Sequence, residues 1–574
     1  MSSICSVLED AASALPEKPL FVFPETRTRQ ALQLTYSQLA QKSIEAARAI
    51  AEAAEPGDRA LLLFPTGPDF WAAFFGCLRQ GIISVPLHTP NINRPSEVLQ
   101  NVCNDCSPTL LITDETTAEL LHRRRERHPY LNGIQVIVPE FRNNMGTSFR
   151  MTAVDASSFP ALIQYTSGST SRPRGVTISH DNLISNLRVI SRQMEIRTDE
   201  DRGVTWLPHY HDMGLVGGYL ATLYSRNTTL CLPPEEFAIR PARWLELISA
   251  SRATVCGGPN FAYQLCADRV SDEDASRLDL SSWRVAYVGA ERIRPEAIDR
   301  FTEKFSRAGF RRRAFFPCYG LAEATLMVTG GPASATPRTR EVSTEGLRNH
   351  QVARPSCDSD ITRICGSGRL IDGTAVVVIS AESKGMLPDD EIGEVCISGP
   401  SVTDGYWRDL GDNRSFREVL RNGTQQRMLL TGDLGFLNEG ELFITGRLKE
   451  LIQIRGRNLY PEDIELQVRN AHPSVSQGAA VAFSVEDDRQ EKLVIVTELN
   501  RSEVNQSGSS DAIVTAIRQR ITECFGVSPF AILLARPGRI PHTSSGKPRR
   551  MLVREAWLRG EFSAGPSTRQ RDSD

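Results

Sequence analysis

The chain has 574 residues, which is more than one hydrophobic core normally organises, so two or more domains are expected. Its composition, with 40% hydrophobic and 24% charged residues, is ordinary for a soluble globular enzyme. The 66 basic and 69 acidic residues leave a net charge of −3, so the charge balance gives no reason to expect a nucleic-acid partner.

The N-terminal residues lack a charged start followed by an apolar stretch, so no signal peptide is predicted. The most apolar region, residues 60–86, is interrupted by Pro, Gly and charged residues and cannot supply the about 20 apolar residues of a membrane span. Twelve cysteines in so long a chain suit a reducing compartment, and we expect a cytoplasmic protein without stable membrane insertion. Cys103 and Cys106 have C-x-x-C spacing, but without a second pair a buried or idle thiol pair is favoured over zinc.

Short β-branched runs alternate with amphipathic stretches across the first three quarters of the chain. Helical periodicity covers residues 36–54 and 241–251, and strands are predicted over residues 60–64, 134–138, 229–232 and 285–288. Strands that alternate with helices predict an α/β fold, in which a large N-terminal domain contains mixed, largely parallel sheets flanked by helices.

Two breaks divide this pattern. From residue 332 to about 365 the periodicity dissolves into Pro, Ser, Thr and Arg, which indicates either a disordered segment or a functional insertion, and a strand then follows over residues 374–379. The second break is at residues 446–449, after which a shorter α/β pattern runs to about residue 560. We therefore predict a large domain over residues 1–447, a small domain over residues 448–560 joined by a minimal hinge, and a flexible tail over residues 561–574.

One loop after a strand start at Leu162 concentrates hydroxyls, small residues and cations. Backbone N–H groups without bulky side chains can turn toward phosphate oxygens, and hydroxyls and guanidiniums would complete a polyphosphate cradle. The Walker pattern is absent, and a Gly/Ser loop taken alone is often only a linker. The candidate phosphate-binding residues of this loop are Thr166, Ser167, Gly168, Ser169, Thr170, Arg172, Arg174 and Gly175.

Three later motifs supply the other groups that a nucleotide needs. Tyr319-Gly320 offers a flat ring for a base, and Glu323, three residues after that glycine, offers a hard oxygen ligand for Mg²⁺. Asp433, in a glycine-flanked turn, can accept from ribose hydroxyls, with Arg447 nearby. Lys547 follows a small-residue loop, from which a cation could neutralise charge at a phosphoryl centre.

Together these motifs resemble the acyl-adenylate-forming superfamily, which contains acyl-CoA ligases, peptide-synthetase adenylation domains and luciferases. The resemblance runs over roughly residues 10 to 555 with every core motif in order. Residues 206–215, 257–263 and 455–465 are most similar to those of fatty acyl-AMP ligases, and the insertion near residues 332–365 falls where those ligases carry an extra segment. The resemblance implies an adenylate-forming fold with a small, mobile C-terminal domain.

The resemblance also implies a role for each candidate residue. Residues 166–175 would hold the phosphates of ATP, and Glu323 would bind Mg²⁺. Lys547 would bridge the substrate carboxylate and the α-phosphate, and Lys449 would be the hinge of the small domain. Asp433 and Arg447 would hold the ribose. The residues that would line the adenine are Gly289, Ala290, Glu291 and Tyr319 with Gly320 beside it.

The implied substrate is a medium- or long-chain fatty acid in an apolar tunnel, and the implied acceptor is the phosphopantetheine thiol of an acyl carrier protein or of a carrier domain in a polyketide or peptide synthase. The insertion is held to favour that acceptor over coenzyme A by restraining domain motion. Open alternatives are an acyl-CoA ligase, a ligase for a non-fatty acid, and an inactive homologue that only binds. Retention of Glu323, Asp433 and Lys547 argues against the last.

Two histidines precede Asp212 in the pattern H-x-H-D. A metal site is disfavoured because no third ligand cluster lies near in sequence. The resemblance places His211 at the substrate end of the active site, whereas His209 could be purely structural. The chain departs from the family where Arg174 replaces a common lysine, which keeps the charge but changes its geometry, and where Leu459 replaces an expected histidine.

Overall fold

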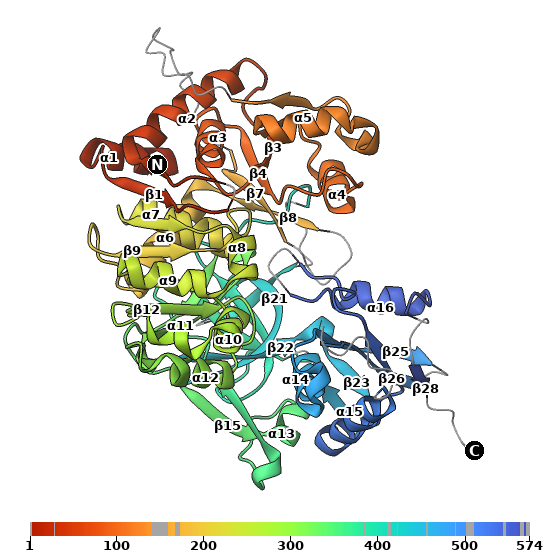
Figure 1. Ribbon diagram of the computed structural model, residues 1–574. Coiled ribbons are helices and arrows are strands. Elements are labelled where there is room, and N and C mark those ends of the chain that lie inside the picture. Colours follow the sequence, from red (N-terminus) through yellow and green to blue (C-terminus); the bar gives the residue numbers. More distant parts are fainter. Residues whose placement is uncertain are drawn as a thin grey trace.

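The computed structural model describes residues 3–27, 29–139, 159–166, 173–380, 382–383, 385–409, 415–421, 423–454, 457–487, 490–500, 510–543, 547–562 and 567–569. A large body comprises most of the chain, and a smaller C-terminal body, drawn in blue, lies beside it (Figure 1). Ser167, Gly168, Ser169, Thr170 and Arg172 of the predicted phosphate loop lie outside the described residues.

The largest sheet forms the centre of the large body. The six neighbouring strands β1, β10, β9, β11, β12 and β13 pair in parallel. Edge strand β2 is antiparallel to β1, and the strands beyond β13 at the other side of the sheet pair antiparallel. Its parallel strands are short buried runs, as expected for strands covered by helices on both faces. In spatial order the strands are β18 (Ala375–Ile379), β19 (Gly393–Ser398), β21 (Thr424–Asn438), β22 (Glu441–Arg447), β17 (Arg369–Leu370), β14 (Met327–Gly330), β13 (Phe315–Gly320), β12 (Val285–Gly289), β11 (Val255–Pro259), β9 (Arg202–Thr205), β10 (Thr228–Cys231), β1 (Pro19–Phe23) and β2 (Leu32–Thr35), with β20 (Phe416–Arg421) paired to β21.

A second, six-stranded sheet carries the predicted phosphate loop at its edge. Its strands are parallel except for the last, because β7 and β8 form an antiparallel pair. The loop of residues 167–173 therefore connects two hydrogen-bonded strands. In spatial order the strands are β6 (Gln135–Ile137), β5 (Leu110–Thr113), β3 (Arg59–Leu63), β4 (Ile83–Leu87), β7 (Leu162–Thr166) and β8 (Arg174–Ile178).

Helices cover both sheets, and several begin at sequence-encoded caps. Thr35 and Gln38 form a reciprocal capping box at the start of α2, and Ser179 and Asn182 form another at α6. The helices of the large body are α1 (Ile4–Ala14), α2 (Tyr36–Ala51), α3 (Pro68–Arg79), α4 (Glu97–Cys106), α5 (Glu115–Arg123), η1 (Arg125–Arg127), η2 (Pro129–Leu131), α6 (His180–Gln193), η4 (Met213–Leu220), α7 (Ala221–Tyr224), α8 (Pro234–Ile239), α9 (Ala242–Ser251), α10 (Asn260–Arg269), α11 (Asp272–Ser276), α12 (Pro295–Phe305), η5 (Arg312–Ala314) and η6 (Ala322–Ala324).

The aperiodic segment of residues 332–365 is folded. It forms a hairpin of β15 (Thr339–Ser343) and β16 (Ile361–Cys365), with α13 (Thr344–Arg348) and η7 (Asp358–Asp360) between the strands. The alternative of a disordered segment is thus wrong, because Val342, Leu347 and Ile364 bury their side chains against β21 and β22 in a local core. The hairpin projects at the lower end of the large body (Figure 1).

The C-terminal body has hydrophobic cores of its own. Two clusters contain only residues from Ile452 onward, which supports the predicted boundary after Arg447, and we retain that boundary as a proposal. Ser567–Arg569 form a strand against β27, and the flexible tail over residues 561–574 stays a prediction. The elements are η9 (Leu448–Glu450), β23 (Ile452–Ile454), β24 (Arg457–Leu459), α14 (Pro461–Ala471), η10 (Pro473–Val475), β25 (Ala480–Asp487), β26 (Gln490–Glu498), α15 (Ser510–Phe525), β27 (Ala531–Ala535), α16 (Arg550–Leu558) and β28 (Ser567–Arg569).

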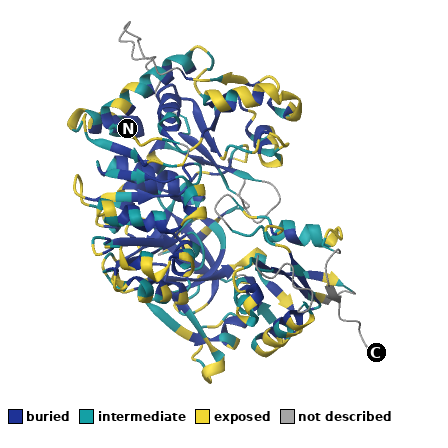
Figure 2. Ribbon diagram, in the orientation of Figure 1, coloured by how far each residue is buried: buried dark blue, intermediate teal, exposed yellow. Residues whose placement is uncertain are grey.

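The predicted α/β class is confirmed, and the predicted strands and helices recur as β3, β6, β10, β12, β18, α2 and α9. Buried residues concentrate in the strands and exposed ones on the outer helix faces (Figure 2). Among the described residues, no helix combines the length and apolarity needed to cross a bilayer. Cys103 and Cys106 are buried on α4, and burial raises the pKa of Cys103 to about 12 and that of Cys106 to about 11.

Candidate active site

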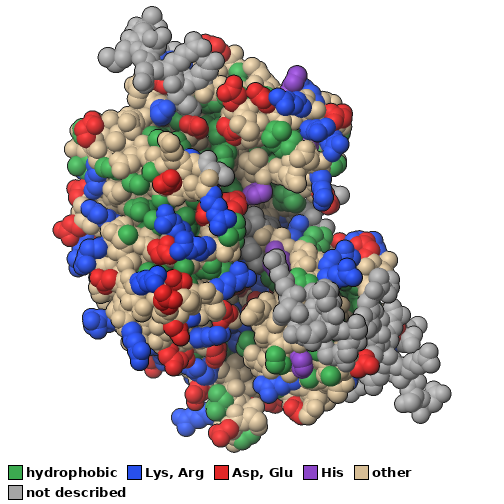
Figure 3. Space-filling model, in the orientation of Figure 1, with side chains coloured by type: hydrophobic (Ala, Val, Ile, Leu, Met, Phe, Trp, Pro, Cys, Tyr) green, Lys and Arg blue, Asp and Glu red, His purple; other side chains and the backbone are tan. Residues whose placement is uncertain are grey.

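A cavity of about 870 Å³ lies where the large and small bodies meet. Its walls come from both, and the molecular surface is hollowed there, between the lobe that bears α4 and the small body (Figure 3). Eight predicted site residues line it: Thr166, His211, Ala290, Tyr319, Gly320, Glu323, Arg447 and Lys547. Residues from distant parts of the sequence therefore meet in one space that has the size of a small-molecule site.

The described ends of the phosphate loop flank this cavity. Thr166 ends β7 and faces Arg174, which begins β8, as its partner in the strand pair. Gly175 has a packing reason to be glycine, since a Cβ there would lie 2.7 Å from Cγ2 of Ile163 and 3.0 Å from the ring of Tyr165. Gly175 thus keeps the two strands close behind the loop.

Arg174 and Glu323 are connected through a tyrosine that sequence reasoning missed. The Arg174 guanidinium lies 3.4 Å from the ring centroid of Tyr406, and the Tyr406 hydroxyl donates to Oε1 of Glu323 at 2.7 Å. Burial raises the pKa of Glu323, and the hydrogen bond from Tyr406 only partly offsets this. Tyr406 lies 83 residues from Glu323 and carries no sequence signal of its own.

Three predicted nucleotide residues form a contiguous group on the large sheet. The Tyr319 hydroxyl donates to Oδ2 of Asp433 at 2.7 Å, and Nε of Arg447 donates to Oδ1 of the same carboxylate at 2.9 Å. Asp433 and Arg447 are direct neighbours on β21 and β22, so the sheet register sets their distance. Asp433 is buried, and its negative charge raises the pKa of Arg447 above its ordinary value.

Lys547 of the small body reaches into the large body. Its ammonium donates to the carbonyl oxygen of Ala290, the residue that follows β12. Ala290 has a φ of 63°, a left-handed conformation that few non-glycine residues adopt, and this turns the chain at the mouth of the cavity. The Lys547 backbone is held by Thr543, whose N–H donates to the Lys547 carbonyl and whose hydroxyl accepts from the Lys547 N–H.

The charge of Lys547 acts on two carboxylates, Glu291 and Asp212. Glu291 accepts the Phe261 N–H at 2.8 Å; its burial raises its pKa, and the charge of Lys547 opposes that shift. For Asp212, burial would raise the pKa, but hydrogen bonds from His211 and from the Met213 N–H, together with the Lys547 charge, lower it. The lysine is thereby charge-balanced at a position where an anionic substrate can enter.

The two histidines have different surroundings. His211 lines the cavity, and its Nδ1 lies 2.6 Å from Oδ1 of Asp212. His209 is buried, its ring lies 4.2 Å from that of Phe70, and burial lowers its pKa to about 3. A structural role therefore suits His209. Among the described residues, no group of three His, Cys, Asp or Glu side chains could hold a metal ion.

Of the other predicted residues, several lie beside the cavity rather than in its walls. Lys449 is exposed on η9, whereas its neighbour Glu450 lines the cavity and pairs with Arg550 of α16. Gly289 is needed for the close approach of β12 to β13, since a Cβ there would lie 2.5 Å from the carbonyl oxygen of Cys318. Arg174, Glu291 and Asp433 act through the contacts described above, and the functional roles of all these residues stay predictions.

The two bodies are also joined by polar contacts outside the cavity. Nη1 of Arg292 donates to Oδ1 of Asp463 at 2.7 Å, and the Arg292 side chain is only 9% exposed. From the hairpin, Nη2 of Arg348 donates to the carbonyl of Cys524 at 2.6 Å, and the Arg348 carbonyl accepts from Nδ2 of Asn458 at 3.0 Å. The insertion thus contacts the small body directly.

The donor set fits one Mg²⁺ held jointly with a nucleotide. Mg²⁺ is usually bound by one or two carboxylates together with substrate phosphates, so the single carboxylate of Glu323 is sufficient. Tyr406 occupies only Oε1 of Glu323 in the hydrogen bonds described above, and Thr166 lies in the same cavity.

Comparison with known proteins gives matches to adenylate-forming enzymes in both the large and the small body. The family model of AMP-binding enzymes matches residues 8–407, and the model of the Disco-interacting protein 2-like AMP domain matches residues 449–566. The chain is 34% identical to a medium-chain-fatty-acid–[acyl-carrier-protein] ligase of Moorena producens, over 97% of this chain and 95% of that protein.

Two solved structures show the likeness in three dimensions. One, from a study of fatty acyl-adenylate ligases of E. coli and L. pneumophila, has a TM-score of 0.86 and 32% identity, with 98% of each chain covered. The other, a fatty acyl-adenylate ligase from L. pneumophila in complex with acyl adenylate and pyrophosphate, has a TM-score of 0.75 and 32% identity, covering 99% of this chain and 98% of that one. The family and fold resemblances read from the sequence are both confirmed.

Proposed function

The chain belongs to the family of AMP-binding enzymes, as a ligase of the fatty acyl-adenylate-forming type, and from this premise we propose that it activates a fatty acid with ATP and passes the acyl group to the phosphopantetheine thiol of an acyl carrier protein. In the first step a carboxylate oxygen attacks the α-phosphorus of ATP, an acyl–O–P bond forms, and pyrophosphate leaves with the electrons of the broken P–O bond. In the second step the thiol sulfur attacks the acyl carbon, AMP leaves, and the thiol proton goes to solvent.

The observation that carries this proposal is the position of Lys547. Both reactants are anionic, so catalysis depends on cations and N–H donors that are held in place before they meet. Lys547 enters from the small body the same cavity that Thr166 and Glu323 line, where it can contact a carboxylate and an α-phosphate together. Mg²⁺ at Glu323 would neutralise charge on the phosphate oxygens.

The other residues would each bind a different part of the nucleotide or of the acyl-phosphate. Asp433 offers carboxylate oxygens to the ribose hydroxyls, Arg447 and Tyr319 hold that carboxylate in place, and Ala290 contributes backbone to the base pocket. His211 lies at the acyl end, with Nδ1 engaged by Asp212 and the other ring nitrogen available to the acyl-phosphate. Residues 166–175 would cradle the β- and γ-phosphates.

Two observations support a carrier-protein acceptor. A similar protein is named a ligase for acyl carrier protein, and the hairpin of residues 339–365 holds the small body through Arg348. An amino acid substrate is disfavoured, because the Asp212 carboxylate already accepts from His211 and from the Met213 N–H.

The test is ATP–pyrophosphate exchange with a panel of fatty, aryl and amino acids, followed by offering the adenylate to coenzyme A or to a phosphopantetheinylated carrier protein. Exchange with fatty acids and a carrier mass increase equal to the acyl group would support the proposal. Exchange only with amino or aryl acids would contradict the substrate class, and acyl-CoA formed without acyl-carrier would contradict the acceptor.

A further inference from the structure

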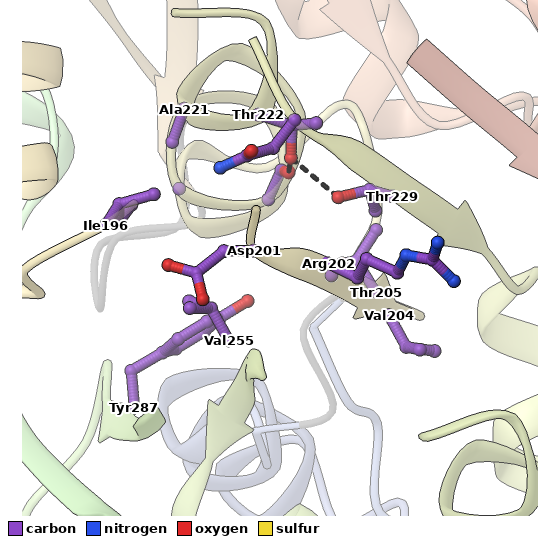
Figure 4. Close-up of a pocket in the computed structure, with 14 residues that line it drawn as sticks. Ile196, Asp201, Arg202, Val204, Thr205, Ala221, Thr222, Thr229, Val255 and Tyr287 are labelled. Atoms are coloured by element: carbon purple, nitrogen blue, oxygen red, sulfur yellow. Dashed lines mark hydrogen bonds between the residues drawn. The ribbon is translucent and has the colours of Figure 1, made fainter. Parts of the chain in front are cut away.

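A second, smaller pocket adjoins the cavity. It has a volume of about 30 Å³, and it shares two lining residues with the main cavity, Gly217 and Tyr287. Figure 4 shows the ring of Tyr287 on one side of this pocket and, on another side, Thr222 and Thr229, whose hydroxyls are hydrogen bonded to each other. Gly217 and Tyr287 thus separate the two spaces.

The two spaces differ in chemistry. The lining of the main cavity includes the apolar residues Ile190, Met194, Met213, Leu326 and Met327, of which Leu326 lies against Gly217. Beyond the wall the lining is rich in polar groups, contributed by Asp201, Thr205, Thr222, Asn227 and Thr229. Oδ1 of Asn227 is buried and has no hydrogen-bond partner among the described residues. A polar pocket of this size suits one or two water molecules rather than hydrocarbon.

The position of Tyr287 follows from the sheet. Tyr287 lies on β12 opposite Gly257 of β11, and a Cβ at position 257 would lie 2.4 Å from Cγ and Cδ2 of Tyr287. The glycine therefore lets the ring cross the neighbouring strand toward Thr205 of β9, which lines the same small pocket. Tyr287 precedes Ala290 by three residues, so at about 3.3 Å per residue it lies roughly 10 Å deeper than the carbonyl that meets Lys547.

We propose that Tyr287, together with Gly217, is the end wall of the acyl tunnel and limits the enzyme to medium-chain acids; this rests on the proposed fatty acid activation. A longer chain would have to move the Tyr287 ring and then place methyl and methylene groups among the polar groups of the small pocket, displacing water whose hydrogen bonds it cannot replace. The ring of Tyr287 and the polar pocket behind it thus both disfavour acids with longer chains.

The experiment measures kcat/KM for acyl-AMP formation over a series of saturated acids with increasing chain length. In Tyr287→Ala the space of the ring opens to the tunnel, so we expect the optimum to move to longer acids, with a gain of about fourfold for each methylene group that fills this space and no further gain for methylene groups that reach the polar pocket. An acid with a terminal hydroxyl should gain more than the plain acid of equal length, because it can donate to Asn227.

Two further variants keep the result interpretable. Tyr287→Phe retains the ring, so its length profile, normalised to its own best acid, should match that of the wild type. Gly217→Ala places a Cβ within 2.9 Å of Cδ2 of Leu326 and pushes that side chain into the tunnel, so it should shorten the preferred chain even if Tyr287→Ala does not fold. An unchanged length profile in Tyr287→Ala and Gly217→Ala, with adenylate still formed, would overturn the end-wall assignment. Absence of fatty acyl-AMP in the wild type would instead overturn the proposed function.

Discussion

The proposed ribose end and the proposed lysine end of the nucleotide site are built in different ways. The ribose end is complete within the large body, because Tyr319, Asp433 and Arg447 lie on strands of one sheet and are already hydrogen bonded to each other. The lysine end needs both bodies, since Lys547 reaches the Ala290 carbonyl across their boundary. In the proposed mechanism, a group that only holds substrate can be fixed in advance, whereas the reacting cation sits on the small body, which would have to withdraw for the second reaction.

The sharpest way to separate the two ends is to remove the lysine. Lys547→Ala should lower acyl-AMP formation about 10²–10³-fold, because it deletes a preorganised charge at the reacting phosphorus. ATP binding, measured by calorimetry, should change little, since the ribose end remains intact. Thiol transfer from chemically prepared acyl-AMP should survive.

A matched control for this variant is Lys449→Ala, which removes an exposed lysine from η9 and leaves the cavity lining unchanged. It should adenylate like the wild type, and if Lys449 is the hinge it should slow thiol transfer instead. Near-normal pyrophosphate exchange in Lys547→Ala would refute the role of Lys547.

The ribose end should respond through KM rather than kcat. Asp433→Ala leaves the sugar hydroxyls without their acceptor, and hydrogen bonds to a charged group contribute about 1.5–3 kcal/mol, so KM for ATP should rise roughly tenfold to a hundredfold. Arg447 is half exposed, so its guanidinium remains solvated, but the buried Tyr319 hydroxyl loses its acceptor, so the free energy of unfolding should fall by about 1–3 kcal/mol. Steady-state kinetics at saturating fatty acid checks this. A fall in kcat with KM unchanged would contradict a role in ATP binding and would indicate that Asp433 acts in the chemical step.

The contact between the bodies can be weakened without touching either end. Asp463→Ala leaves the nearly buried Arg292 guanidinium without its partner, so the arrangement that delivers Lys547 should become less populated. A shift of about 1–2 kcal/mol corresponds to a roughly 5–30-fold slower adenylation. The control is Asp272→Ala, where the carboxylate is 99% exposed and pairs with Lys304 at 3.8 Å. Equal rates in the two variants would show that the Arg292–Asp463 pair does not hold the bodies together.

The same comparison explains what the sequence could predict. Strand and helix periodicity located β12 and α2, and short motifs located Asp433, Glu323 and Lys547, because these depend on local pattern. Tyr406 and the Asp212 carboxylate were missed as partners, since their roles arise from packing between segments far apart in the chain. Residues 332–365 have no periodicity because their hairpin is held by a few buried side chains against β21 and β22, and their fold could not be predicted from local pattern.

The smallest effect expected is a gain in the stability of the fold on replacing Glu323, because the charge that would bind Mg²⁺ destabilises the folded protein. Burial raises the pKa of Glu323, so the folded state binds its proton more tightly than the unfolded state does. Its contribution to stability is therefore fully present below the ordinary pKa of a glutamate and is lost as the pH rises through the raised value, so at neutral pH the ionised group destabilises the fold.

Glu323→Gln keeps an acceptor for Tyr406 and should raise the midpoint of thermal unfolding at pH 7 but not at pH 4. It should also weaken Mg²⁺-dependent adenylation, because an amide is a poorer ligand for Mg²⁺ than a carboxylate. Equal unfolding midpoints at pH 7 would mean that the carboxylate is already solvated, and the metal assignment would then depend on the Mg²⁺ titration alone.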